Sequence, residues 1–447
     1  MAATMSQREG PSRCGVAEPE EDSYRAFQLR HEEHHLRYSR IVSLRVLVFD
    51  PFDFAFVLIF MADRISDGNF LRRALDLARQ GIGLASPNPY VGAVIVDGNG
   101  MIVGTGAYTY NGVKHAEVRA LEHAGDKARG GTLYINLEPH SHQGRTPACT
   151  DALIAAGIRR VVASMPDPNP KVSGSGFDKL RAAGVEVEVG GDEAEARHLN
   201  ENFARYIRHG IPLVTLKAAI TLDGKIAASP RSILSRTAGA APGGWITGET
   251  ARAQVQEQRH QSDAVMVGVG TIIADDPLLT DRSGGSRRRP LLRVILDSRL
   301  RLPMESRLVK SVRNDSSKSD VLIFCSSPDE DRKRELEARG IRIELVPPDQ
   351  DGRPDLAAVM RRLGQLELTS VMIEGGATVN SAALASDVVD KVFLYYAPRI
   401  MASKESVPWL SSAGSGLNRD LMVAQTRWHQ FGEDFAVEGY LRDPYQE

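Results

Sequence analysis

Apolar and polar positions alternate along this chain with two different periods, and the changes of period predict where helices and strands lie. From residue 67 to residue 78, apolar side chains recur every three or four positions, which is the spacing of a helix with one buried face. We expect Asp67 to cap this helix. Two short apolar runs, 91–96 and 101–106, then flank the turn sequence DGNG and predict a β-hairpin.

Helical and strand-like segments continue to alternate up to about residue 210. The expected elements are a helix over 115–124, a strand over 132–137, a polar loop to Pro147, a helix over 148–156, a strand over 160–164, a helix and a strand within 177–189, and a charged helix through Arg208. This order predicts a layered α/β domain.

A second α/β series begins at residue 211 with the strand sequence PLVTLKAAIT. Its expected helices are 250–259 and 356–366, and its expected strands are 264–267, 292–296, 321–324, 343–346, 370–373 and 391–396. Such alternation favours a largely parallel, doubly wound sheet. We therefore divide the chain into an N-terminal extension of unknown role, 1–65, a first domain, 66–210, and a second domain, 211–447.

The N-terminal extension carries two features that could suggest a function. The sequence HEEHH at 31–35 is typical of a solvated charged segment and, with less weight, of a metal site, because no second ligand cluster lies near it in the sequence. The apolar run 46–61 is shorter than the ~20 residues that cross a bilayer and contains Asp50 and Asp53. We expect neither a membrane anchor nor a secretory signal here.

Composition narrows the class of function. The chain has 447 residues, of which 42% are hydrophobic and 25% charged, and its formal net charge is -2, so no basic field favours nucleic acid. Three cysteines are too few for a disulfide framework, which fits a reducing cytoplasm. We expect a cytoplasmic homo-oligomer that acts on a small molecule, with neither nucleic acid nor a membrane as partner.

One set of residues in the first domain carries a recognisable chemistry. His115-Ala116-Glu117 opens a predicted helix, and Pro139-His140 and then Cys149 follow further along. An H-x-E segment with a later, proline-led ligand pair is the signature of zinc nucleobase deaminases. Three protein ligands leave one zinc position for a water molecule, and a carboxylate next to the first ligand can carry that water's proton to the leaving amine. Glu117 is our candidate for this carboxylate.

Longer words around these residues resemble the bifunctional deaminase/reductase family of riboflavin biosynthesis. The matching words are NPYVG at 88–92, HAE at 115–117 and LEPHSHQGRTPAC at 137–149. The resemblance implies a cytidine-deaminase-like three-layer α/β/α domain that hydrolyses an amino group from a diaminopyrimidinone ribosyl phosphate. One position departs from the family, because His140 stands where the family has its first zinc cysteine. Imidazole is an ordinary zinc ligand, so a His/His/Cys site is chemically reasonable.

Four words in the second half match the same family in the same order. They are Leu216-Lys217 with Leu222-Asp223-Gly224, then WITG at 245–248, GVGTIIADDP at 268–277 and Glu374-Gly375-Gly376. The resemblance implies a dihydrofolate-reductase-like α/β domain that uses NADPH to reduce the ribosyl side chain to ribityl. A second departure lies here, since Gly243 replaces the family's substrate-contacting serine.

The resemblance also implies site residues, position by position. The zinc ligands would be His115, His140 and Cys149, with Glu117 as the catalytic proton carrier. The cofactor NADPH would contact Ile220, Trp245, Thr271, Asp275, Ser298 and Gly376. Substrates would contact Asn88, His142 and Arg145 in the first domain, and Lys217, Gly243, Arg259, Leu279, Arg282 and Glu374 in the second. Arginines at 259 and 282 would suit a sugar phosphate, which they can bind bidentately. No residue is assigned as proton donor for the reduction.

Two other interpretations remain open at this point. His140 could mark a decayed deaminase joined to an active reductase, and zinc content per chain would separate this from a bifunctional enzyme. A nucleic-acid deaminase shares the H-x-E chemistry, but the chain lacks the C-x-x-C spacing and is not basic.

Overall fold

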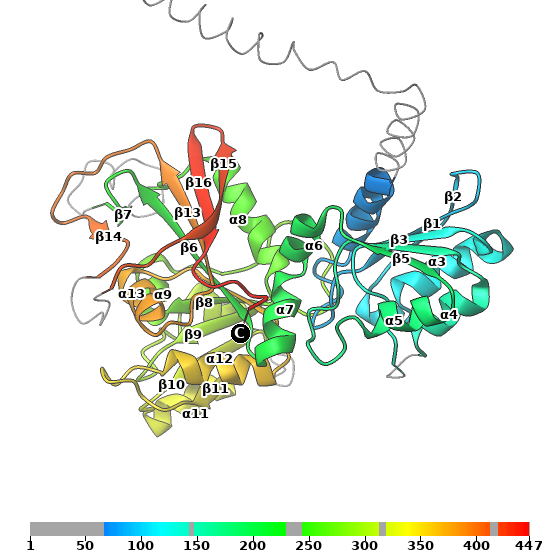
Figure 1. Ribbon diagram of the computed structural model, residues 1–447. Coiled ribbons are helices and arrows are strands. Elements are labelled where there is room, and N and C mark those ends of the chain that lie inside the picture. Colours follow the sequence, from blue (N-terminus) through cyan, green and yellow to red (C-terminus); the bar gives the residue numbers. More distant parts are fainter. Residues whose placement is uncertain (1–66, 143–146, 229–243, 313–318, 412–418, 447) are drawn as a thin grey trace, which may run out of the picture. The chain divides into compact units, whose positions relative to one another are not determined.

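The computed structural model describes residues 67–142, 147–228, 244–312, 319–411 and 419–446 (Figure 1). The HEEHH sequence and the apolar run 46–61 lie outside the described residues. Within the described part, one sheet is built from residues 92–189 and a second from residues 213–440. The bounds 66–210 and 211–447 of the two expected domains remain a prediction.

The first sheet has the strand order β2-β1-β3-β4-β5. Its strands are β1 (Gly92–Val96), β2 (Ile102–Ala107), β3 (Thr132–Ile135), β4 (Arg160–Ala163) and β5 (Glu186–Val189). The predicted hairpin is β1 and β2, and β1 also pairs antiparallel with β3. From β3 to β5 the pairing is parallel.

Helices cover both faces of this sheet because alternate strand residues point to opposite sides. Ala93 and Ile95 share a buried cluster with residues of α3 (Ala116–Ala124), α4 (Cys149–Ala156) and α5 (Ser175–Ala182). Val94 and Val96 instead pack on the helical segment 67–79. The result is three layers. Asp67 is already helical, and its carboxylate accepts hydrogen bonds from Arg160 rather than acting as the expected cap.

Two glycines of β2 allow α3 to lie close against the sheet. A Cβ atom on Gly104 would sit 2.2 Å from the carbonyl oxygen of Ala120, and one on Gly106 would sit 2.1 Å from that of Ala116. Any larger residue would push α3 away, so these glycines set the position of its first turn.

The charged helix expected before residue 210 is two helices in the structure. They are α6 (Glu193–Leu199) and α7 (Glu201–His209), and Asn200 lies between them. The amide of Asn200 is fully buried and binds both the backbone N–H and the carbonyl of Tyr90. This side chain therefore ties the break between the helices to the NPYVG segment. Two short 3₁₀ helices, η1 (Tyr110–Gly112) and η2 (Gly125–Ala128), complete this part of the chain.

The second sheet has the order β11-β10-β9-β8-β12-β6-β13-β16-β15. Its strands are β6 (Leu213–Thr221), β8 (Ala264–Gly268), β9 (Leu292–Leu296), β10 (Val321–Cys325), β11 (Arg342–Leu345), β12 (Ser370–Ile373), β13 (Lys391–Ala397), β15 (Ala424–Phe431) and β16 (Asp434–Tyr440). Pairing is parallel from β11 through to β13, as predicted. The β15–β16 hairpin, which adds to β13 in antiparallel fashion, was not expected.

Helices again cover both faces of the parallel strands. Helices α12 (Leu356–Gln365) and α13 (Ala377–Ala385) pack on one face, and α9 (Val269–Asp275), α10 (Arg307–Lys310) and α11 (Glu330–Ala338) pack on the other. Helix α8 (Glu249–Gln261) packs against β13 and β16. A separate two-stranded ribbon pairs β7 (Lys225–Ala227) with β14 (Val407–Pro408).

Among the helices that lie wholly in the described ranges, none is both long enough and apolar enough to cross a membrane.

Candidate functional site

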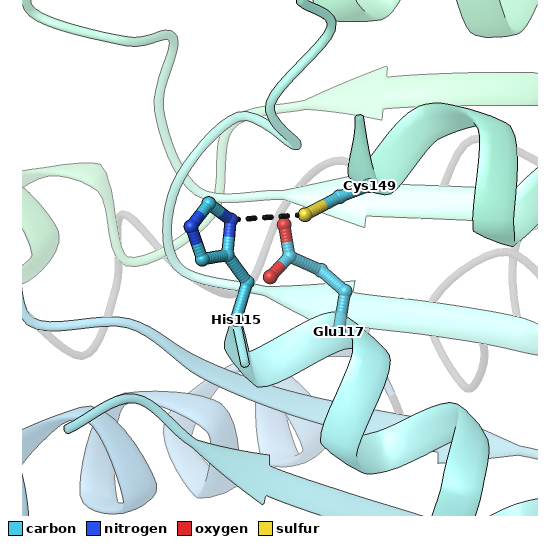
Figure 2. Close-up of side chains that lie close together, drawn as sticks. All are labelled: His115, Glu117 and Cys149. Atoms are coloured by element: carbon cyan, nitrogen blue, oxygen red, sulfur yellow. Dashed lines mark hydrogen bonds between the residues drawn. The ribbon is translucent and has the colours of Figure 1, made fainter. Parts of the chain in front are cut away.

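Three side chains with metal-binding or acid–base chemistry meet between two helix N-termini in the first sheet's domain. Figure 2 shows that His115, Glu117 and Cys149 point toward one another. His115 caps α3, Glu117 lies in its first turn, and Cys149 is the first residue of α4. Their candidate ligand atoms all lie within 4.8 Å of one another. Nδ1 of His115 lies 3.0 Å from Sγ of Cys149.

His140 lies beside this group, in the segment between β3 and α4. Its ring centroid is 5.4 Å from that of His115, and its carbonyl accepts the backbone N–H of Thr150 next to Cys149. Nδ1 of His140 is buried and has no hydrogen-bond partner. Burial and then the neighbouring His142 and His115 lower the pKa of His140 to about 4, so its imidazole is neutral at pH 7.

Burial also sets the protonation of the two acidic groups. Glu117 is 3% exposed and Cys149 is 1% exposed. Desolvation raises the pKa of the Glu117 carboxyl, although His115 opposes the shift. Desolvation, followed by the charge of Glu117, raises the pKa of the Cys149 thiol. A cation placed between Glu117 and Cys149 would have the opposite effect on the pKa of the Cys149 thiol, because the cation stabilises the thiolate and promotes loss of the proton.

The segment that carries His140 is anchored by a residue that our sequence analysis did not single out. The carboxylate of Glu138 is buried and accepts three backbone N–H groups, from Asp167, Gly174 and Gly176, at 3.0, 2.8 and 2.7 Å. Three such bonds hold the carboxylate and hence the neighbouring His140 in one place. The sequence feature that could have drawn attention to Glu138 is its position in the matching word LEPHSHQGRTPAC at 137–149.

Asn88 also reaches this site through a partner that we did not predict. Nδ2 of Asn88 donates to the hydroxyl of Tyr108 at 2.5 Å, and the ring of Tyr108 meets that of His115 edge to face at 5.6 Å. This contact joins segments far apart in the sequence, so no local pattern could reveal it. Arg145 lies outside the described residues.

These residues fit a zinc ion. Bonds of ~2.0 Å to nitrogen and ~2.3 Å to sulfur at a tetrahedral angle place the two ligand atoms about 3.5 Å apart. The observed His115–Cys149 separation is 3.0 Å, so a small outward movement of the two side chains would admit the ion. Nδ1 of His140 is buried without a partner beside this group, but the ligand atoms that lie within 4.8 Å of one another belong to His115, Glu117 and Cys149. Glu117 is close enough to act on a molecule held there.

A second charged cluster lies in the other sheet's domain. The guanidinium of Arg259, on α8, donates to both carboxylate oxygens of Glu374, at 2.6 and 3.1 Å, and to the carbonyl of Thr280 at 2.9 Å. Nζ of Lys217, on β6, lies 3.7 Å from the same carboxylate. Burial alone would raise the pKa of Glu374, but Arg259 and Lys217 outweigh it and the net shift is downward. Burial lowers the pKa of Lys217.

The structure thus brings together three of the residues expected to contact the second substrate. Leu279, which is buried, precedes the Thr280 carbonyl that Arg259 binds. Arg282 is exposed, and its backbone N–H donates to Gln256 of α8. Because the guanidinium of Arg259 is committed to Glu374 and Thr280, Arg282 is the more available cation. Gly243 lies outside the described residues.

The residues expected to bind NADPH follow the carboxyl ends of neighbouring parallel strands. Ile220 is near the end of β6, Thr271 and Asp275 are on the helix after β8, Ser298 follows β9, and Gly376 follows β12 and caps α13. These four strands are adjacent in the sheet, so Ile220, Thr271, Ser298 and Gly376 follow one edge, whereas Asp275 is the last residue of α9. Ligands of open α/β sheets bind at this edge. The carbonyl of Trp245 accepts a bond from Arg399, which follows β13 at the same edge.

Two family models match the chain. The model described as the RibD C-terminal domain matches residues 212–437, and the model described as the cytidine and deoxycytidylate deaminase zinc-binding region matches residues 64–165.

Curated relatives match nearly their whole length. A riboflavin biosynthesis protein RibD from Actinobacillus pleuropneumoniae is 40% identical over 381 residues, which are 85% of this chain and 96% of the relative. Another, from Escherichia coli K12, is 39% identical over 76% of this chain and 89% of the relative.

Two solved structures are also similar to this chain over most of its length. RibD from Acinetobacter baumannii superposes with a TM-score of 0.69 at 33% identity, covering 84% of this chain and 98% of that one. A protein from Thermotoga maritima, described as a diaminohydroxyphosphoribosylaminopyrimidine deaminase and 5-amino-6-(5-phosphoribosylamino)uracil reductase, superposes with a TM-score of 0.67 at 34% identity and with the same coverage.

Proposed function

The chain belongs to the RibD family of riboflavin biosynthesis proteins, and we propose that residues 66–210 hydrolyse an amino group from a diaminopyrimidinone ribosyl phosphate, after which residues 211–447 reduce the product with NADPH. It is a bifunctional enzyme with a deaminase and a reductase domain. The first domain has the cytidine-deaminase-like three-layer fold, and the second has the dihydrofolate-reductase-like α/β fold.

The zinc ligands in this proposal are His115, His140 and Cys149. The observation that carries it is the convergence of His115 and Cys149 at 3.0 Å, with the buried, unpartnered Nδ1 of His140 beside them. Zinc held by three protein ligands supplies a nucleophilic water near neutral pH. A decayed deaminase would have no reason to keep this arrangement of nitrogen and sulfur atoms in a buried site, so we do not favour that alternative.

Glu117 moves the proton in the hydrolysis. Its carboxylate accepts a proton from the attacking water and passes it to the departing amino group, which leaves as ammonia. Burial raises the pKa of this carboxyl, which suits a group that must both take up and release a proton. Asn88, held by Tyr108, would bind the pyrimidine edge, and His142 would contact the same substrate. Arg145 stays a predicted substrate contact outside the described residues.

In the second domain, NADPH would lie along the carboxyl edge of β6, β12, β8 and β9, where it supplies the hydride. The α13 N-terminus at Gly376 presents backbone N–H groups that suit a cofactor phosphate. Lys217, Glu374 and Leu279 would line the substrate side, and Arg259 would hold Glu374 in place. Gly243 stays a predicted substrate contact outside the described residues. Arg282, which is exposed, would bind the ribosyl phosphate.

The proposal also includes a cellular compartment and an oligomeric state. We place the enzyme in a reducing cytoplasm, consistent with free thiols at Cys149 and Cys325 in the described residues. We also expect a homo-oligomer. Edge strand β15 exposes Trp428, which stacks on Phe435 and would be covered in such an assembly.

Metal analysis of three proteins tests the deaminase assignment. Wild type and Glu117→Gln should each retain one zinc per chain, and Cys149→Ala should lose it. Deamination should be absent from both variants, whereas reduction should survive in both because its residues lie in the other sheet's domain. A wild-type protein that binds no zinc would contradict the assignment.

A further inference from the structure

A strained backbone segment leads to Arg282, the residue that we expect to bind the ribosyl phosphate. Leu279 has a φ of +55°, a conformation that is costly for a residue with a bulky side chain. The carbonyls of its two neighbours accept hydrogen bonds from buried guanidinium groups, that of Arg293 at 3.1 Å and that of Arg259 at 2.9 Å. The backbone just before Arg282 is therefore fixed from both sides.

After Arg282 the chain returns to helix α8 and places the guanidinium of Arg287 against the C-terminal end of that helix. This guanidinium donates to three carbonyls at 3.0, 2.9 and 2.6 Å, those of Arg259, His260 and Ser262. They lie in the last turn and the C-cap of α8, where a helix has few N–H groups left to bind its carbonyls. A cation at this end also suits the helix dipole.

The same guanidinium binds the residue next to Arg282. Arg287 donates to the carboxylate of Asp281 at 3.2 Å, and Nδ1 of His260 lies 2.9 Å from the same oxygen. The three side chains, those of Arg287, Asp281 and His260, are only 8–13% exposed. Burial alone would raise the pKa of this carboxyl, but hydrogen bonds, first from the backbone of Ser283 and then from His260 and Arg287, lower the pKa to about 2. Asp281 is therefore ionised at pH 7, which strengthens its bond to Arg287.

The backbone at Arg282 is tied to the same helix. Its N–H donates to the side chain of Gln256 on α8 at 3.0 Å, and the N–H of Ser283 donates to the carboxylate of Asp281 at 2.9 Å. Arg282 itself is exposed, so a ligand can reach it from solvent. Buried contacts thus hold the backbone of a residue whose side chain is accessible.

We propose that Arg287 is a positioning residue for Arg282: its contacts with Asp281 and with the end of α8, here called the clamp, fix the place from which Arg282 binds the substrate phosphate. This inference rests on the phosphate contact of the proposed function. Arg287 donates to four carbonyls and one carboxylate, so its own guanidinium is occupied. It acts on the phosphate through Arg282 and not by touching it.

The clamp predicts a loss that is smaller than the loss of the contact itself. Arg282→Ala removes the contact and should raise the KM for the phosphorylated substrate roughly thirtyfold. Arg287→Met removes only the clamp and should raise this KM roughly tenfold, within the coupling expected of neighbours in one network. The kcat should change less than about twofold in either variant, because the reacting atoms lie away from the phosphate.

A double-mutant cycle on the full-length protein measures this dependence. NADPH oxidation is followed for wild type, Arg282→Ala, Arg287→Met and the double variant, with the deaminated ribosyl phosphate and with the same compound lacking its phosphate. In the Arg282→Ala background, Arg287→Met should raise the KM less than about twofold further, because no contact is left to position. The KM for the compound without phosphate should be the same in all four proteins.

Asp281→Asn separates positioning from simple electrostatics. Removal of a negative charge near the phosphate would by itself lower the KM, whereas removal of the positive charge at Arg287 would raise it. The clamp predicts instead that Asp281→Asn and Arg287→Met both raise the KM for the phosphorylated substrate. A KM that Asp281→Asn lowered would overturn the proposal.

Arg442→Met is the matched control for the loss of a guanidinium. Arg442 donates to the carbonyl and the carboxylate of Asp387, at 3.1 and 2.8 Å, and to the carboxylate of Asp390 at 3.2 Å. These partners precede β13 and have no contact with the segment that carries Arg282. Arg442→Met should therefore lower stability in urea, as Arg287→Met does, without changing the KM of either compound.

Each other result has a definite meaning. An equal rise in KM on Arg287→Met with and without Arg282 would show that Arg287 acts on the substrate directly, and an unchanged KM would leave it no role. Both results would overturn the positioning role and leave the proposed function intact. A lower kcat with both compounds, in place of a higher KM for the phosphorylated one, would show general damage and would also overturn it. If Arg282→Ala left the KM unchanged, the phosphate contact of the proposed function would fail, and this inference with it.

Discussion

The buried carboxylate of Glu374 should contribute far more stability than a less buried carboxylate that also faces two cations. Glu374→Gln preserves the shape of the side chain but removes the charge that Arg259 and Lys217 face. Arg259 binds this carboxylate bidentately, and all three side chains are only 10–13% exposed. Removing one partner of a buried ion pair leaves an uncompensated charge and costs about 3–5 kcal/mol. Since some solvent remains, we expect about 3 kcal/mol.

Glu344 provides a matched control. Its carboxylate accepts two bonds from Arg362, at 2.5 and 3.2 Å, and one from Arg342 at 3.1 Å, but the side chains are 22–38% exposed. Solvent screens such a group, so Glu344→Gln should cost about 0–1 kcal/mol. The two variants therefore differ mainly in burial.

Urea unfolding followed by tryptophan fluorescence measures both costs. All three tryptophans, Trp245, Trp409 and Trp428, lie after residue 211, so the signal reports the reductase domain. A Glu374→Gln cost of less than about 1 kcal/mol, or one equal to that of Glu344→Gln, would refute the reasoning.

The pH dependence has a definite sign. The folded-state pKa of Glu374 is depressed, so its contribution is present above its unfolded pKa of about 4.3 and is lost as the pH falls through the folded value. The difference in stability between wild type and Glu374→Gln should therefore shrink only below about pH 4.3. A difference that shrank between pH 8 and pH 6 would point to another group.

Two further predictions concern the two catalytic halves separately. Arg282→Ala should raise the reductase KM for the phosphorylated substrate roughly thirtyfold, which corresponds to about 2 kcal/mol for a lost charge-assisted contact, and an unchanged KM would assign Arg282 to the surface. Gly106→Ala should displace α3, because the new Cβ would meet the Ala116 carbonyl at 2.1 Å, and lower both zinc affinity and deamination. Gly98→Ala, whose Cβ would meet nothing within 4 Å, is its control and should leave both unchanged.

The strands that could be predicted from sequence are those with continuous apolar runs. Strand β9 was expected with its observed bounds, because buried parallel strands are apolar on both faces. The β15–β16 hairpin was missed since β15 is mostly exposed and polar at the edge of the sheet. Asn200 interrupts the helix 193–209 through a bond to Tyr90, a contact that no local pattern encodes.

The residues of the candidate site could be selected from local sequence, but the contacts between distant segments could not. Residue type and spacing were enough to select His115, Glu117 and Cys149, which the structure brings together. The contribution of Tyr108 and the contact of Arg287 with Asp281 depend on how distant or looped segments fold. Likewise Arg259 and Glu374 were each expected near the substrate, but their bidentate bond joins positions 115 residues apart and required the fold.

The most direct test of a bifunctional enzyme is NADPH consumption with each of two substrates in wild type and Glu117→Gln. Wild type should oxidise NADPH with both the diaminopyrimidinone ribosyl phosphate and its deaminated product. Glu117→Gln should oxidise NADPH with the deaminated product alone, because the first domain can no longer make it. NADPH oxidation by Glu117→Gln from the undeaminated substrate at the wild-type rate would contradict the account.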